Sequence, residues 1–145
     1  KKIYLSPVMD LFNREILSYS ISLSPNMKMI DEMLERLFCT REIKKGVIMH
    51  SDQGALYQSS SYQKNLADKG IVQSMSRKAT CLDNAVIENF FGLLKSEMFY
   101  GKEFESIEHF TEELKEYIRY YNEDRIKIKL DGLSPVQYRL TKFAS

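Results

Sequence analysis

Apolar and polar residues alternate along two short segments near the start of the chain, which predicts two β-strands. The first runs from Lys2 to Asp10 and contains Pro7, which removes a backbone donor and indicates an edge or bulged strand. The second, Glu15 to Leu23, alternates Ile, Leu, Tyr and Ile with polar residues. Residues 11–14 between them predict a turn in which Asn13 suits a left-handed conformation, so we expect a hairpin.

The rest of the chain alternates between helical and strand-like patterns. Apolar spacing predicts helices at about 26–40, 58–69, 80–98 and 107–121, with a short last helix after Ser134-Pro135. Short apolar runs predict strands at 46–50 and 71–74, and the first of these is typical of a buried, parallel strand. Strands joined by helices favour an α/β domain with a mixed sheet.

The segment 80–98 predicts a helix with one apolar and one polar face. At about 100° per residue, its apolar residues fall in one arc, while Asn84, Glu88 and Lys95 fall on the opposite side. Glu88 and Lys95 are two turns apart, so they lie about 20° from each other around the helix and ~10 Å apart along it. A polar face of this kind is either simply solvated or part of a site.

Composition gives no global sign of nucleic-acid binding. The 145 residues carry a net charge of +1, with 43% hydrophobic and 28% charged residues, which is ordinary for a globular domain. Any DNA contact must therefore come from local basic patches, of which the sequence has three: Lys44-Lys45, Arg77-Lys78 and the alternating run Arg125 to Lys129. Each patch has solvated surface as its alternative, which we prefer for Lys44-Lys45.

Cysteine use and hydropathy indicate a cytoplasmic protein. The two cysteines, Cys39 and Cys81, lie far apart without a CxxC motif, which argues against a zinc site and fits a reducing compartment. We expect Cys39 to be a buried residue near a helix end. No segment has the ~20 apolar residues of a membrane span. The chain begins without Met directly on a strand-like run, so we expect a fragment or a processed form.

Asp52 and Glu88 are the candidate catalytic pair. Asp52 follows the predicted strand 46–50, and ligand sites in α/β sheets lie beyond the carboxyl ends of strands. Two converging carboxylates repel each other unless a cation lies between them, and hard oxygen ligands favour Mg²⁺ or Mn²⁺. Such ions suit phosphodiester chemistry. The alternative for Asp52 alone is an Asx-turn residue before Gly54.

Three motifs surround these residues: His50 to Gly54 (HSDQG), Asp83 to Phe91 (DNAVIENFF) and Leu94 to Glu97 (LKSE). Together they resemble the signature of insertion-sequence transposases of the OrfB type, in family three of these elements and in the retroviral-integrase superfamily. The 35 residues between Asp52 and Glu88 match the separation that names the D,D(35)E group, and Lys95 matches its basic residue. The runs YLSPVMDLFNREI, SRKATCLDN and YYNEDRIKIKLDGLSPVQYR extend the resemblance over essentially the whole chain.

The resemblance implies an α/β, RNase H-like mixed sheet flanked by helices and metal-dependent DNA cleavage and strand transfer in transposition. Carried onto this chain, it implies that Asp52 and Glu88 bind Mg²⁺ or Mn²⁺, with carboxylates within about 8 Å of each other. It also implies that Lys95 and Asn84 face DNA near the cut. Arg77 and Lys78 would contact phosphates from the loop before the helix.

One part of the family pattern is missing. The family has a third, first-occurring carboxylate on a central strand, and this chain starts at what matches strand two; Asp10 matches a non-catalytic position. We therefore expect a truncated catalytic core at residues 1–124 and a basic tail with a short helix at 125–145. Two alternatives stay open: an inactive remnant that only binds DNA or oligomerises, and a related nuclease that acts by hydrolysis alone.

The absent strand also predicts open sheet edges. Without it, the strands at 3–9 and 47–50 each have an unpaired edge, and buried unpaired backbone groups cost roughly 1–3 kcal/mol each. The two edges could pair with each other, or two chains could lend each other a strand. Pro7 weakens the first route, so we favour a homo-oligomer that binds mobile-element and target DNA.

Overall fold

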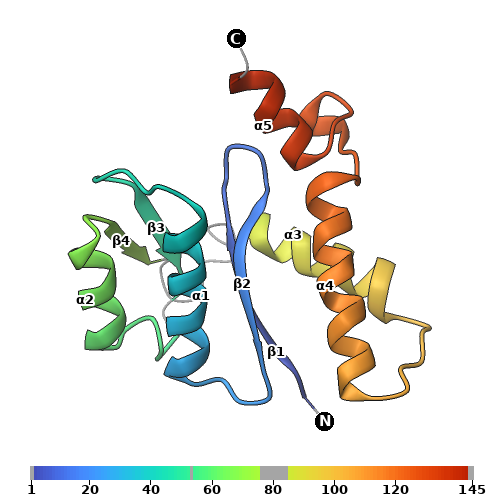
Figure 1. Cartoon of the computed structure of the whole chain (residues 1–145), viewed down its shortest axis with the longest axis horizontal. Helices are drawn as coiled ribbons and strands as arrows, with labels where there is room; N and C mark the ends of the chain where they lie inside the picture. Colours follow the sequence, from blue (N-terminus) through green and yellow to red (C-terminus); the bar gives the residue numbers. More distant parts are fainter. Residues whose placement is uncertain (1, 53, 76–84, 144–145) are drawn as a thin grey trace. The chain divides into compact units, whose positions relative to one another are not determined.

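The computed structural model describes residues 2–52, 54–75 and 85–143. Its elements in chain order are β1 (Tyr4–Met9), β2 (Ile16–Ser22), α1 (Met27–Thr40), β3 (Ile48–Ser51), α2 (Ser60–Asp68), β4 (Val72–Met75), α3 (Ala85–Leu94), a π-helical turn (Lys95–Phe99), α4 (Ile107–Glu123), a 3₁₀ turn (Ile128–Leu130) and α5 (Pro135–Phe143) (Figure 1). The chain divides into two compact units. Unit 1 is Lys1–Val8 with Leu17–Ala85, and unit 2 is Met9–Ile16 with Val86–Ser145.

β1 and β2 pair in a two-stranded sheet, so the predicted hairpin is confirmed. Its turn is closed by a bond from the Asp10 N–H to the Glu15 carbonyl (2.9 Å) and one from the Arg14 N–H to the Asp10 carbonyl (2.8 Å). The left-handed residue is Arg14, with φ 65°, so the expectation for Asn13 is wrong. Asn13 is fully buried instead, because its amide makes hydrogen bonds inside unit 2.

Unit 1 is built on the apolar face of α1. Asn26 caps this helix by accepting a hydrogen bond from the Met29 N–H at 3.2 Å. The core joins that face to α2 and to the residue before β4; its members are Met29, Ile30, Met33, Leu34, Tyr62, Leu66 and Ile71. Burial of each large apolar side chain in such a cluster contributes roughly 1.5–3 kcal/mol. The strands of unit 1 are therefore held by helix packing as well as by their own hydrogen bonds.

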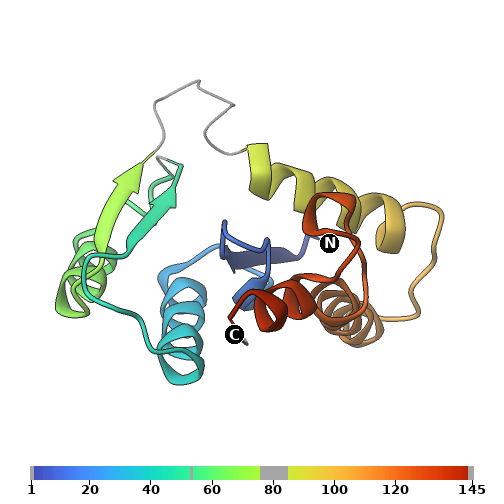
Figure 2. The ribbon, with the colours of Figure 1, turned by 90° about the horizontal axis from the view of Figure 1, so that it is seen from above.

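β3 and β4 pair in parallel, as the sequence predicts. His50 lies opposite Ser74 in the register, and Figure 2 shows the two strands side by side next to α2. The prediction that the strand at 46–50 is buried is wrong: Val47 is 43% exposed and Ile48 is 65% exposed. The reason is that only one face of this sheet meets the core, through Met49. The opposite face has no cover within the described part of the chain.

The described residues form two separate two-stranded sheets, β1–β2 and β3–β4, rather than one joined sheet. Tyr4 and Val8 of β1 and Met49 of β3 nevertheless pack against the same core cluster of unit 1. β1 and β3 thus pack on one core, and in the described residues they belong to different sheets. The open edges stay a prediction. Direct pairing of these two strands, the first of the two routes to closing their edges, is not observed among the described residues.

Unit 2 holds the hairpin turn through buried polar groups. Asn13 donates to Glu15 Oε1 at 3.0 Å, and Glu15, only 5% exposed, accepts from Arg139 at 2.9 Å. The side chain of Asn122 on α4 accepts from the Ile16 N–H (2.8 Å) and donates to the Ile16 carbonyl (3.0 Å). The Asn122 side chain therefore pairs with both backbone polar groups of Ile16, as a neighbouring strand would. Satisfied networks of this kind fix one arrangement of the elements that they join.

The apolar part of unit 2 joins α3 to α4. Phe90 of α3 is completely buried and meets the ring of Tyr121 edge-on, with 4.9 Å between ring centroids. The buried residues of α4 recur at helical spacing: Leu114, Tyr117, Ile118 and Tyr121. No helix in the described ranges is both long and apolar enough to cross a membrane.

We expect Asn13→Ala to lower the free energy of unfolding by about 2–3 kcal/mol, because it removes the Asn13 donor from the Pro135 carbonyl and one of the donors to the buried Glu15. Urea denaturation followed by circular dichroism measures this loss. The control is Asn65→Ala on α2, which removes only an exposed 3.4 Å contact with Asp31 and should cost less than about 0.5 kcal/mol. Equal, small losses for both variants would contradict the role given to the network.

Candidate functional site

Asp52 follows the last residue of β3, at the carboxyl end of a parallel strand, and its side chain is exposed. Its Oδ1 accepts a hydrogen bond from the Gly54 N–H at 2.8 Å, so the Asx turn at Asp52 is confirmed. A Cβ on residue 54 would lie 2.9 Å from that oxygen, so glycine is needed there for the carboxylate to keep its place. The turn orients Asp52 without burying it.

The loop after Asp52 is tied to the sheet of unit 1. Gln73 on β4 donates to the Tyr57 carbonyl at 2.7 Å, and His50 contacts Ser74 across the strands at 2.9 Å. Burial raises the pKa of Tyr57, a hydrogen bond with Ser6 lowers it, and the nearby charge of Asp52 raises it further. The Tyr57 hydroxyl is therefore neutral beside the carboxylate, and the carboxylate faces no competing anion from it.

Glu88 lies on the exposed side of α3, and Lys95 is the exposed first residue of the π-helical turn that follows, in agreement with the predicted polar face. Both side chains are exposed, whereas Phe90 is fully buried on the other side. Glu88 is in the first turn of the helix, where the aligned N–H groups favour negative charge. Among the described residues, nothing lies within 4 Å of a Cβ added to Gly92, which lies between them.

A π-helical turn, which the sequence does not predict, begins at Lys95. The Tyr100 N–H donates to the Lys95 carbonyl at 2.7 Å, closing the wider ring. In this turn Glu97 accepts hydrogen bonds from the Tyr117 hydroxyl on α4 (2.7 Å) and from Nη2 of Arg125, which follows α4 (2.6 Å). The Arg125 hydrogen bonds are the main reason that the pKa of Glu97 lies below its ordinary value. Residue spacing in the sequence does not predict that Glu97 pairs with Arg125, because the two residues lie 28 positions apart.

The structure leaves part of the predicted site untested. Asp52 belongs to unit 1 and Glu88 to unit 2, so the distance between their carboxylates stays a prediction. Asn84, Arg77 and Lys78 lie outside the described residues. Within those residues there is no cluster of three or more His, Cys, Asp or Glu side chains that could hold a metal ion. The exposed, hard carboxylate oxygens of Asp52 and Glu88 do suit Mg²⁺ or Mn²⁺ in their chemistry.

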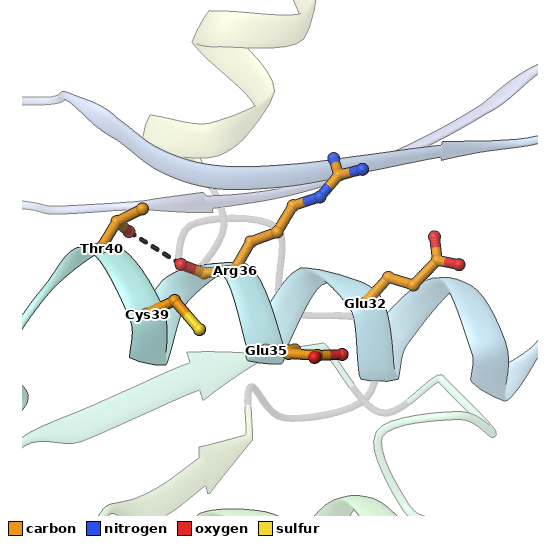
Figure 3. Close-up of a pocket in the computed structure, with 5 residues that line it drawn as sticks. All are labelled: Glu32, Glu35, Arg36, Cys39 and Thr40. Atoms are coloured by element: carbon orange, nitrogen blue, oxygen red, sulfur yellow. Dashed lines mark hydrogen bonds between the residues drawn. The ribbon is translucent and has the colours of Figure 1, made fainter.

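A shallow pocket on the surface of α1 does not belong to this site. Figure 3 shows its lining side chains, all from one helix: Glu32, Glu35, Arg36, Cys39 and Thr40. Cys39 is exposed, so its predicted burial is wrong; it lies off the stripe of residues that α1 buries. Arg36 donates to the Tyr19 carbonyl at 2.9 Å, and Thr40 donates to the Arg36 carbonyl at 2.8 Å. These contacts serve the helix and hairpin rather than a ligand.

Comparison with known proteins confirms the resemblance drawn from the motifs. Two family profiles, both described as integrase core domain, match residues 1–81 and 88–143. The chain is 52% identical over 139 residues to transposase InsK of insertion sequence element IS150 from Escherichia coli K12, covering 96% of this chain and 49% of that protein. It is 51% identical over 138 residues to a transposase-like protein of Haemophilus influenzae, covering 95% of this chain and 63% of that protein.

Two solved structures confirm the RNase H-like fold class. The catalytic core domain of BIV integrase matches with a TM-score of 0.71 at 15% identity, covering 99% of this chain and 90% of that one. A chain of the simian T-cell lymphotropic virus intasome, solved in complex with PP2A regulatory subunit B56 gamma, matches with a TM-score of 0.74 at 13% identity. That match covers 92% of this chain and 47% of the other. This chain spans about half of the InsK transposase and less than two thirds of the Haemophilus influenzae protein.

The Glu97–Arg125 pair gives a prediction with a defined pH dependence. We expect Glu97→Gln to lower the free energy of unfolding by about 1 kcal/mol near neutral pH, since the pair is charged but Glu97 is 33% exposed. Because the folded pKa is depressed, this contribution is full above the ordinary value of 4.5 and is lost as pH falls through the folded value. Denaturation of both proteins over a pH series measures it.

The matched control is Glu112→Gln, which removes a 3.7 Å exposed pair with Lys115 on α4. This variant should change stability by less than about 0.5 kcal/mol at every pH. A Glu97→Gln penalty that stays constant down to pH 3 would show that the lost contact is not a charged one.

Proposed function

Because the chain belongs to the integrase core domain family, we propose that it is the catalytic-core part of an insertion-sequence transposase, which cleaves DNA and transfers strands at the ends of a mobile element. The observation that carries this proposal is the 52% identity with a transposase over 96% of the chain. The position of Asp52 at the carboxyl end of β3 supports it, because that is where α/β sheets place their ligands.

Asp52 and Glu88 are the residues that would hold the divalent ions. The Gly54 N–H orients one oxygen of Asp52, and the buried face of α3 turns Glu88 outward. When bound, Mg²⁺ or Mn²⁺ supplies activation of a water or a 3′-hydroxyl and neutralises charge at the leaving oxygen of a phosphodiester. The protein would hold the Asp52 and Glu88 carboxylates near each other, although their like charges repel when no cation is bound.

Lys95, which begins the π-helical turn directly after α3, is the proposed phosphate contact next to Glu88. Its side chain is exposed and lies about two helical turns beyond Glu88. At that distance it would hold a DNA phosphate beside the cleaved bond rather than the cleaved phosphate itself. Asn84, Arg77 and Lys78 remain candidates for further DNA contacts from the segment before the helix. A cytoplasmic location also stays a prediction.

We further propose that the chain works as a homo-oligomer on DNA. In the described residues β1 and β3 each pair with a single strand over an apolar core, which supports this, because an edge without a partner favours an added strand. The structural neighbour from simian T-cell lymphotropic virus is part of an intasome, which agrees with an assembly, although the likeness itself shows only the fold. The competing function, an inactive remnant that only binds DNA or oligomerises, predicts no dependence on the two carboxylates.

Titration calorimetry with Mn²⁺ tests the metal ligands. We expect millimolar affinity, about −4 kcal/mol, since only two ligands are identified. Asp52→Asn and Glu88→Gln should each abolish the binding heat, because each removes a carboxylate ligand. Asp68→Asn, an exposed carboxylate at the end of α2, is the control and should leave the heat unchanged. Unaltered heat in both Asp52→Asn and Glu88→Gln would put the ion elsewhere and favour the inactive remnant.

A further inference from the structure

The run Arg125 to Lys129 is oriented opposite to what its pattern suggests. Alternating apolar and charged residues normally bury the apolar side. Here Ile126 is 63% exposed and Ile128 is 96% exposed, while Arg125 and Lys127 are partly buried. The cations face the protein and the isoleucines face solvent.

Specific contacts hold the two cations inward. Arg125 donates from Nε (2.8 Å) and Nη2 (2.6 Å) to the two carboxylate oxygens of Glu97. The Lys127 ammonium lies 5.3 Å from the centre of the Tyr121 ring. The inversion is therefore built into the fold of unit 2.

The turn that carries Ile128 is rigid. Lys127 and Leu133 form an antiparallel bridge, with the Lys127 N–H donating to the Leu133 carbonyl at 3.0 Å. The Gly132 N–H returns a bond of 3.0 Å to the Lys127 carbonyl, and Leu130 is buried at 4% exposure. Asp131 and Gly132 have positive φ values of 58° and 75°, which closes the turn. Ile128 is thus presented at a fixed position, so little conformational freedom is lost if a partner covers it.

The surroundings of the turn are cationic. Burial lowers the pKa of Lys127 most, and Arg125, Arg14 and Lys129 lower it further, while Glu97 acts in the opposite direction. Glu97 is bound to Arg125, and Asp131 lies 3.5 Å from Lys142, so these acids already have cationic partners. An anionic partner would relieve the repulsion at Lys127, which favours a polyanion over a neutral protein surface.

We propose that the turn 126–129 is a second DNA-contact element of this chain, in which the exposed Lys129 binds a phosphate, Ile128 makes an apolar contact with the sugars or bases of a groove, and Lys127 and Arg14 add positive charge behind them. Apolar side chains flanked by cations contact duplex DNA in this way. The inference rests on the proposed function, because it takes DNA as the substrate.

The test is fluorescence anisotropy with duplex DNA over a salt series, using the whole chain. Lys129→Ala should reduce the slope of log affinity against log salt by about one, since one phosphate contact is lost. Ile128→Ala should weaken binding about tenfold and leave the slope unchanged, because an apolar contact releases no counterions. Thermal stability and Mn²⁺ binding heat should be unchanged in both variants, since both side chains are exposed.

Controls separate this inference from the proposed function. Lys115→Ala on α4 and Leu23→Ala, 55% exposed at the end of the hairpin, should bind DNA as the wild type does. If Lys95→Ala lowers the salt slope while Ile128→Ala and Lys129→Ala bind normally, the inference fails and the proposed function stands. If the wild type binds no DNA, both fail. If Ile128→Ala alters only self-association in sedimentation, the turn is a contact between chains and the inference is overturned.

Discussion

Burial of the Tyr121 side chain is the constraint on which unit 2 depends. At 1% exposure it meets Phe90 of α3, donates its hydroxyl to the Arg14 carbonyl at 2.8 Å and carries Lys127 over its ring. Burial raises its pKa to about 12, so the hydroxyl stays a donor at any physiological pH. The Tyr121 side chain on α4 thereby positions α3, the turn of the β1–β2 hairpin and the turn 126–129.

This arrangement links the two proposed DNA contacts within unit 2. Phe90 fixes which side of α3 is buried, and Glu88 and Lys95 face outward as a consequence. The π-helical turn that begins at Lys95 then brings Glu97 to Arg125, the residue just before the exposed isoleucines. π-helical turns are often found at functional sites, and this one connects Lys95 through Glu97 to Arg125, next to the turn 126–129.

The sequence predicts the parts of the fold that depend on local patterns. The hairpin, the parallel pairing of β3 with β4, the stripe of α1 and the polar face of α3 all follow from residue spacing. The errors arise where a distant partner decides the outcome. Asn13 is buried because the Pro135 carbonyl accepts from it, and Ile48 is exposed because one face of its sheet meets no core in the described residues. The outward isoleucines at 126 and 128 depend likewise on Glu97 and Tyr121, which lie elsewhere in the fold.

Crystals of the chain soaked in Mn²⁺ would reveal by anomalous diffraction whether Asp52 and Glu88 together hold the metal ions, as we propose. We expect a peak in the anomalous difference map within about 2–2.5 Å of an oxygen of each carboxylate, with the two carboxyl groups within about 8 Å of each other. A structure with the two side chains on opposite faces of the protein, or with the ion bound by other residues, would contradict it.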